Sequence, residues 1–296
     1  MRKFSFASPA GLVTAILAAG LIAWPIAAAH AQNSTARPAE PGKTPAKQDP
    51  AKPQPNDDFL ARAGKLYYSA ARSGMRGFDC AVHPDWHGLF ASASKGVAVA
   101  DNDPRIVLLK AVNIKLHGRL TGGSTLEWNQ AANPTPPVDA DSAAMLDSMH
   151  SATSQTLEGF MQFWTPFVDG SVIPANAEGL EITQTENGRR IHIDEGGTSV
   201  TELFDSSLIL QHFDVVTGGM TVNFAPSYRP TEKGLLVSGF RAHIQPPGVA
   251  REQATEMHVE IEYQTLGGSP IPARINADVA NSGTFNFVLD GCTVNP

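Results

Sequence analysis

Basic residues are in short supply in this 296-residue chain: 22 Lys and Arg face 29 Asp and Glu, which gives a net charge of −7. There is no basic tract, and this argues against a nucleic-acid partner, because the neutralisation of phosphates supplies most of that affinity. The same deficit argues against electrostatic docking on an anionic membrane surface. With 42% hydrophobic and 17% charged residues, the composition excludes a coiled coil, a collagen-like chain and a fully disordered chain.

Short catalytic motifs are missing as well. The chain contains no Gly-x-Ser-x-Gly nucleophile turn, no His-Glu-x-x-His metal helix and no glycine-rich phosphate loop. These absences favour a protein that is not an enzyme and needs no cofactor. A catalytic triad can also be assembled from residues far apart in sequence, so an unrecognised secreted hydrolase stays an alternative.

The first 31 residues have the layout of an export signal. Two basic residues precede an apolar run over residues 10–29, and this run closes on the small-x-small site Ala29-His30-Ala31. Such an order is typical of a secretory signal peptide. We expect cleavage after Ala31 and a periplasmic or secreted protein, with an uncleaved membrane anchor as the alternative.

Residues 32–57 predict a disordered linker. Six of these 26 residues are proline, and no apolar residue is larger than alanine or proline. The segment therefore has too little to bury to offset the entropy of becoming ordered. The folded part is expected to be a single domain over residues 58–296.

Hydrophobic periodicity in the folded part predicts helices followed by strands. Apolar side chains recur at three- and four-residue spacing after Asp57 and again from Leu146 to Trp164. Pro166 is expected to end this second, long helix. From Gly179 onward, alternating apolar and polar residues are separated by Asn-Gly and Gly-Gly turn signals, which predicts an antiparallel meander. The expected fold class is α+β: an antiparallel β meander curled into a half-barrel, with an N-terminal helix and one long inserted helix packed on its concave face.

This order of elements resembles the LolA/LolB-like superfamily of periplasmic lipoprotein-carrier half-barrels. The shared features are an N-terminal helix, a few strands, a long inserted helix and a long antiparallel meander, and they cover residues 58–296. The resemblance implies a concave apolar groove that holds an acyl chain. It also implies a lipid or a lipoprotein as partner, and a peripheral association with the cell envelope.

Large apolar side chains on the long helix and the last strands are the candidates for lining such a groove. If the sheet curls, the two sets must face each other, since neither is stable in water. Methionine suits a ligand groove because it repacks around varied shapes. A fully packed core, in a tethered structural or protein-interaction module, is the alternative for the same residues. The candidates are Leu146, Met149, Leu157, Phe160, Met161 and Trp164 on the helix, and Met257, Val259, Ile261, Tyr263, Phe285 and Phe287 on the strands.

The only two cysteines, Cys80 and Cys292, are expected to form a structural disulfide. Both lie on predicted strands, 212 residues apart, and a single pair of thiols in an exported protein is most often bridged. A redox-active pair is the alternative, although such pairs usually have the spacing Cys-x-x-Cys.

Two histidines, His83 and His87, have the four-residue spacing that chelates a metal ion on a helix. No third or fourth ligand is evident nearby, and Pro84 lies between them. We therefore interpret this segment as a surface loop anchored by Trp86, and no metal is expected.

Overall fold

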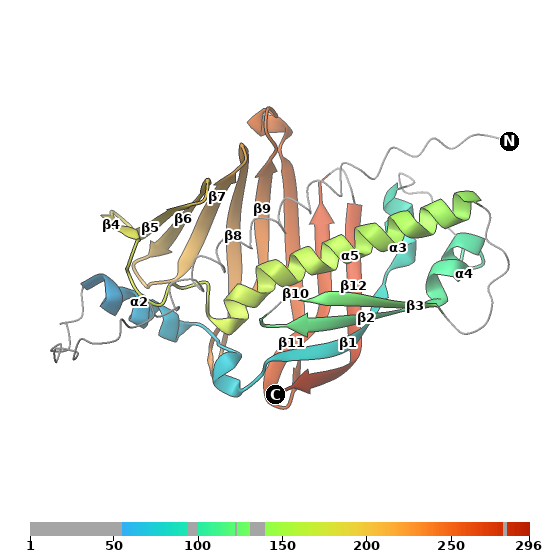
Figure 1. Ribbon diagram of the computed structural model, residues 1–296, viewed down its shortest axis with the longest axis horizontal. Coiled ribbons are helices and arrows are strands. Elements are labelled where there is room, and N and C mark those ends of the chain that lie inside the picture. The colour runs from blue at the N-terminus through green and yellow to red at the C-terminus, as the bar shows by residue number, and fades with distance from the viewer. Residues whose placement is uncertain (1–54, 94–99, 122, 131–139, 281–282) are drawn as a thin grey trace, which may run out of the picture.

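One open antiparallel sheet and a few helices make up the protein, which confirms the α+β class (Figure 1). The computed structural model describes residues 55–93, 100–121, 123–130, 140–280 and 283–296. The predicted signal peptide lies outside the described residues, as does the predicted linker except for its last three residues. None of the described helices has the length and apolarity that a membrane span requires.

The described helices are the two that the sequence predicted and four shorter ones, of which two are 3₁₀ helices. The first begins at Pro55, where proline is favoured because the N–H of a first-turn residue has no partner in the helix. A short helix that we did not predict follows Asp103, whose side chain caps it by accepting a hydrogen bond from the N–H of Arg105. The helices are α2 (Pro55–Leu66), η1 (Ala71–Ser73), α3 (Trp86–Ala93), α4 (Pro104–Lys110), α5 (Ala140–Asp169) and η2 (Arg251–Gln253).

Twelve strands form a single sheet in the order β3-β2-β1-β12-β11-β10-β9-β8-β7-β6-β5-β4. The nine strands from β4 to β12 form the meander, and the sequence pattern predicted all of them except β6. The three strands that precede α5 extend it, because β1 pairs with β12. The strands are β1 (Gly77–Pro84), β2 (Val112–Arg119), β3 (Thr125–Gln130), β4 (Glu181–Thr185), β5 (Gly188–Glu195), β6 (Thr198–Asp205), β7 (Leu210–Thr217), β8 (Met220–Thr231), β9 (Gly234–Gln245), β10 (Thr255–Leu266), β11 (Ser269–Val279) and β12 (Gly283–Asn295).

The long helix α5 connects the two edge strands, β3 and β4, and crosses one face of the sheet (Figure 1). Alternate side chains of the strands point toward this face. On β10, for example, Met257, Val259 and Ile261 are buried, whereas the residues between them are exposed. The core therefore lies between α5 and the sheet, as the alternation predicted.

The prediction that Pro166 ends the long helix was wrong, because α5 continues to Asp169. Tertiary contacts offset the loss of one backbone hydrogen bond. Phe167 and Val168 are buried in the core, and the carbonyl oxygen of Val168 accepts a hydrogen bond from the N–H of Ala70. The last turn is thus held by the segment that follows α2.

The sequence pattern did not predict strand β6. Its buried face consists of Thr198, Val200, Glu202 and Phe204, so two of its four inward residues are polar. The apolar alternation that marks a half-buried strand is therefore interrupted, although the strand lies in the middle of the meander.

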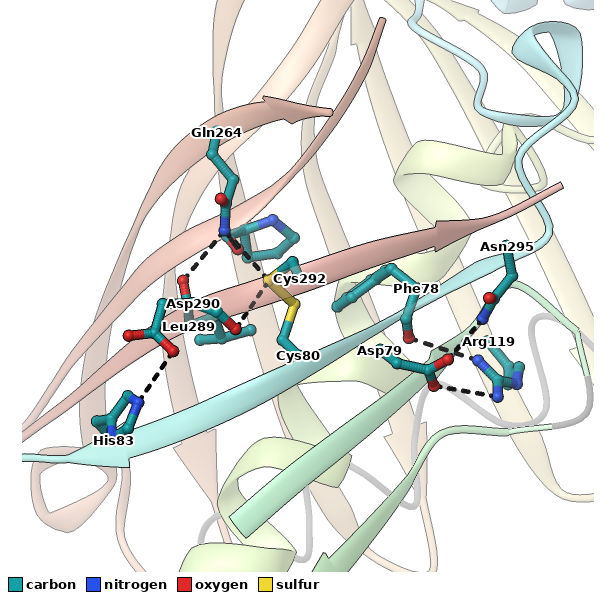
Figure 2. Close-up of a disulfide and its surroundings, with 11 residues drawn as sticks. Phe78, Asp79, Cys80, His83, Arg119, Gln264, Leu289, Asp290, Cys292 and Asn295 are labelled. Atoms are coloured by element: carbon teal, nitrogen blue, oxygen red, sulfur yellow. Dashed lines mark hydrogen bonds and ion pairs between the residues drawn. A yellow bond between two sulfur atoms is a disulfide. The ribbon is translucent and has the colours of Figure 1, made fainter. Parts of the chain in front are cut away.

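The predicted disulfide between Cys80 and Cys292 is present and joins β1 to β12 (Figure 2). The two strands are neighbours in the sheet although 212 residues separate the cysteines. Cys80 is buried, and Gln264 on β10 donates a hydrogen bond to the sulfur of Cys292 at 3.3 Å. The covalent bond thus joins the first described strand to the last one.

Candidate functional site

The twelve groove candidates all lie in the core or at its margin, on α5, β10 and β12. Nine are buried and three are partly buried, namely Leu146, Met149 and Tyr263. The helix set and the strand set belong to one cluster of packed side chains. The two apolar surfaces that the sequence indicated therefore do belong to the same core.

A small cavity of about 30 Å³ lies between the middle of α5 and the sheet. It is about the size of one water molecule, and an apolar lining keeps such a cavity dry. In this conformation the interface is closed around the cavity, which is too small for an alkyl chain. Five groove candidates line it: Leu157, Phe160, Met257, Val259 and Phe287. The other lining residues are Thr156, Gly159, Phe163, Phe224, Phe240, Ile275 and Ala277.

Two tryptophans attach α5 to the sheet by hydrogen bonds. Near the C-terminal end of the helix, Trp164 Nε1 donates to the Tyr263 hydroxyl at 2.8 Å, and that hydroxyl donates to the carbonyl of Val237 at 2.6 Å. Nearer the N-terminal end, Trp128 Nε1 on β3 donates to Ser154 Oγ at 3.1 Å. Over the described residues, no hydrogen bond or ion pair joins the helix segment 155–163 to the sheet. That segment rests on the sheet through apolar contacts alone.

Phenylalanine rings fill the space on one side of the cavity. The ring of Phe163 on α5 lies 3.8 Å from that of Phe240 and 5.5 Å from that of Phe224, centroid to centroid. Phe213 on β7 stacks on Phe224 at 4.6 Å. Aromatic side chains with two rotatable bonds pack well, yet they offer no directional bond that fixes the helix.

Glu202 is a functional candidate that the sequence reasoning missed. Its side chain lies on the inward face of β6, only 2% exposed, and its Oε2 atom has no hydrogen-bond partner among the described residues. Burial raises the pKa of Glu202 to about 8. The carboxyl group is therefore mostly protonated at neutral pH. The only sequence signal was a single acidic residue in a segment without clear alternation.

Two tyrosines border this buried carboxyl group. Burial raises the pKa of Tyr67 to about 12. A hydrogen bond from the N–H of Leu210 opposes this rise, and the charge of Glu202 adds slightly to it. The ring of Tyr228 on β8 packs edge-on against that of Tyr67 with centroids 5.4 Å apart. Tyr67 follows α2, so this helix end helps to cover Glu202.

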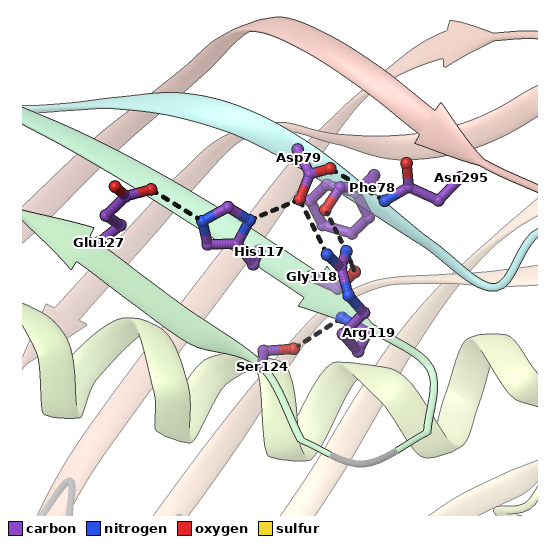
Figure 3. A network of polar contacts seen from close by, with 8 residues as sticks. All are labelled: Phe78, Asp79, His117, Gly118, Arg119, Ser124, Glu127 and Asn295. Atoms are coloured by element: carbon purple, nitrogen blue, oxygen red, sulfur yellow. Dashed lines mark hydrogen bonds and ion pairs between the residues drawn. The ribbon is translucent and has the colours of Figure 1, made fainter.

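A second polar cluster lies on the opposite face of the sheet (Figure 3). Asp79 on β1 accepts hydrogen bonds from His117 Nδ1 at 2.7 Å, from Asn295 at 3.0 Å and from Arg119 at 3.2 Å. His117 Nε2 contacts Glu127 on β3 at 3.2 Å. Among the described residues, His117 bonds to these two carboxylates and to no hydroxyl or thiol nucleophile. The cluster thus joins β1, β2, β3 and β12 and has no catalytic arrangement.

The two histidines considered as metal ligands have separate partners. His83 contacts Asp290 at 3.0 Å and His87 contacts Asp101 at 3.0 Å. Within the part of the chain that the structure describes, no group of three or more His, Cys, Asp or Glu side chains could hold a metal ion. Trp86 is buried, as expected for an anchor, but the prediction of a surface loop was wrong. His83 lies at the end of β1, where pairing with β12 extends the strand to Pro84, and His87 lies in the first turn of α3.

No protein-family model matches the chain, and no curated protein is similar enough in sequence to guide the assignment of a site. The interpretation of the interface between α5 and the sheet therefore depends on its geometry. That geometry comprises an apolar cavity, a helix segment without polar bonds to the sheet, and one buried carboxyl group.

Proposed function

We propose that this protein is exported to the cell envelope and binds a hydrophobic ligand, a lipid or the acyl chain of a lipoprotein, between α5 and the sheet. On this proposal the open sheet is a half-barrel of the LolA/LolB type and α5 covers its concave face. The proline-rich segment that precedes α2 serves as a tether. The arrangement of one long helix across a single face of a twelve-stranded antiparallel sheet supports this interpretation.

The cavity under the middle of α5 is the observation that carries the proposal. Side chains that line a void have no contact partners on that side, so the void marks the place where helix and sheet fit each other less closely. Its lining is apolar apart from Thr156, and includes Met257, whose flexible side chain can repack around a guest. Apolar cavities that stay dry bind apolar guests.

Ligand entry requires α5 to move, because an alkyl chain is larger than the cavity of about 30 Å³. Moving the segment 155–163 away from the sheet breaks apolar contacts and no hydrogen bond to the sheet. An incoming alkyl chain replaces those contacts with equivalent ones, so the cost of opening is largely offset in the complex. The hydrogen bonds of Trp128 to Ser154 and of Trp164 to Tyr263 then keep α5 attached on either side of this segment.

A closed-core interaction module is the second candidate. It is favoured by the burial of nine of the twelve groove candidates, including Leu157, Trp164 and Phe287, whose side chains are fully buried. In that case the cavity is a packing defect and α5 does not open. The two candidates differ in whether the wild-type protein binds an apolar probe.

Filling the cavity provides the test. Ala277 lines it, so Ala277→Val is expected to leave stability nearly unchanged while weakening the binding of a fluorescent fatty acid. Ala63 is the matched control, since it is buried in α2 and does not line the cavity. Ala63→Val overpacks the core and should cost about 1–3 kcal/mol of unfolding free energy, with the affinity for the probe retained.

Native mass spectrometry of the protein purified from its own envelope provides the second readout. A bound lipid that is lost in Ala277→Val and kept in Ala63→Val is the expected result. If the wild type carries no lipid and binds no fatty-acid probe, the ligand-binding proposal fails and the closed-core module remains.

Export has a separate test. N-terminal sequencing of the mature protein from the envelope fraction should start at Gln32. An intact Met1 in a membrane pellet would instead indicate that the apolar run over residues 10–29 is kept as an anchor.

A further inference from the structure

One carboxyl group interrupts the inward, apolar face of the sheet. Glu202 points inward from β6, and its Oε2 atom has no hydrogen-bond partner among the described residues. A buried polar atom without a partner is unfavourable, so the oxygen needs a donor or acceptor that the described chain does not supply. The Tyr67 hydroxyl accepts a hydrogen bond from the N–H of Leu210, and among the described residues neither this hydroxyl nor the buried hydroxyl of Tyr228 is bonded to Oε2 of Glu202.

The strand register places Glu202 in one row with the cavity. Residues that lie directly opposite one another on neighbouring strands form this row. It begins at Glu202 on β6 and continues through Phe213 on β7, Phe224 on β8, Ala242 on β9 and Met257 on β10. Phe224 and Met257 line the cavity. Because neighbouring strands lie about 4.8 Å apart, the row extends about 10 Å from Glu202 to Phe224 and about 19 Å to Met257.

We propose that Glu202 binds the polar end of the ligand, and that this ligand is a single-chain amphiphile whose head group is an uncharged hydroxyl, as in a fatty alcohol or a protonated fatty acid. Its alkyl chain lies along the row from Glu202 toward Met257, in the space that opens between α5 and the sheet. This inference rests on the proposed function and adds the chemistry and the direction of the bound molecule.

The chemistry of the head group follows from the state of Glu202. A buried carboxyl group that carries its proton both donates and accepts a hydrogen bond, and a hydroxyl group does the same. A cationic head group would require two charges to be buried together, whose desolvation offsets much of their attraction. A hydrocarbon without a hydroxyl group would leave Oε2 without a partner.

Two probes of equal chain length test the proposal, dodecanol and dodecane, each measured by displacement of Nile red from the full mature chain. The variants are Glu202→Leu, which removes the hydrogen bond, and Glu202→Gln, whose amide still donates and accepts. We expect Glu202→Leu to bind dodecanol about tenfold more weakly than the wild type, which corresponds to one hydrogen bond. Its affinity for dodecane should be unchanged or higher, and Glu202→Gln should retain most of the affinity for dodecanol.

Thr198 offers the matched control. It is a second buried polar residue on the inward face of β6, and its hydroxyl is already bonded to that of Thr217 at 3.0 Å. Thr198→Val should leave the affinity for both probes unchanged. Infrared difference spectra add a direct signature, because dodecanol binding should shift the C=O band of a protonated carboxyl group in the wild type and not in Glu202→Gln.

The outcomes separate the two proposals. If neither probe displaces Nile red from the wild type, the proposed function itself fails. If both probes bind and Glu202→Leu weakens both equally or neither, the ligand site remains and Glu202 is not its anchor. A dodecanol-specific loss together with the infrared shift supports both proposals.

Discussion

The junction of β1 with β12 and the interface of α5 with the sheet are held by different kinds of contact. At the junction, the disulfide between Cys80 and Cys292 and the three hydrogen bonds to Asp79 fix the strands by covalent and directional bonds. At the interface, the helix segment 155–163 meets the sheet through apolar side chains around a cavity. Directional bonds define one geometry, whereas apolar contacts allow a surface to separate and repack.

The difference reflects what each region must do. Strands β1 and β12 are distant in sequence and become neighbours only in the folded sheet, so their register depends on specific bonds. The helix α5 is bonded to the sheet at Ser154 and at Trp164, and among the described residues the segment 155–163 between them has no polar bond to the sheet. On the proposed function, the first region is the rigid frame and the second is the part that opens.

The largest expected effect is on the rigid frame. The double variant Cys80→Ala/Cys292→Ala should lose roughly 5 kcal/mol of unfolding free energy, because the bond closes a loop of 212 residues in the unfolded chain. Urea denaturation, with the wild type in reductant as a second comparison, measures the loss. A denaturation midpoint that is the same in the wild type, the reduced protein and the variant would contradict the stabilising role.

Glu202 should make stability depend on pH. Burial raises its pKa from an ordinary 4.5 to about 8, so between these values the folded state keeps a proton that the unfolded state has released. Stability therefore falls as the pH rises through this window and levels off above it, with a total of about 4–5 kcal/mol. Urea denaturation across the window measures this change, and Glu202→Gln should abolish it. Glu260 is exposed, so Glu260→Gln is the control and its stability should depend on pH as that of the wild type does. An equal pH dependence of stability in the two variants would refute the assignment to Glu202.

The cavity should reduce the cost of truncating a neighbouring ring. Phe160→Ala is expected to lower the free energy of unfolding by about 3 kcal/mol, which is at the low end for the truncation of a buried phenylalanine. The reason is that one side of this ring faces the cavity and makes fewer contacts. Phe285 is equally buried and does not line the cavity, so Phe285→Ala should cost about 1 kcal/mol more. Chemical denaturation compares the two. A larger loss in Phe160→Ala would indicate a tightly packed α5.

The smallest effect concerns the polar cluster beside the disulfide. Burial alone would raise the pKa of Asp79, but hydrogen bonds from Asn295, His117 and Arg119 outweigh it and lower that pKa. Asp79→Asn should therefore cost about 1–2 kcal/mol at neutral pH. Since the folded-state pKa is lowered, the contribution is present above the ordinary value of 3.8 and is lost as the pH falls below it. The stability difference between variant and wild type, measured by urea denaturation, should shrink on acidification; a constant difference would assign the loss to packing.

Much of the fold followed from periodicity, and its failures have a common cause. The stripe from Leu146 to Trp164 and the alternation on β10 predicted elements that the structure contains, because a single face of each is apolar. Strand β6 escaped notice because Thr198 and Glu202 occupy its buried face. Pro166 was misjudged because tertiary contacts hold the final turn of α5.

The candidate site was predictable in composition and not in shape. Periodicity identified the side chains that face the core, and five of the twelve candidates line the cavity. The position of the cavity depends on how α5 crosses the sheet, a matter of packing between residues far apart in sequence. The row that connects Glu202 to Met257 depends on the register of five strands, which no local pattern specifies.

By itself the sequence determined the α+β class, the antiparallel meander, the long amphipathic helix and the pairing of Cys80 with Cys292. Each of these depends on local periodicity, on turn residues or on there being only two cysteines, and these are properties of the chain before it folds. The tertiary structure alone decided that β1 lies beside β12, that a cavity remains under α5, and that Oε2 of Glu202 is buried with no hydrogen-bond partner among the described residues. These features arise when distant side chains compete for the same space, so only the packed molecule determines them.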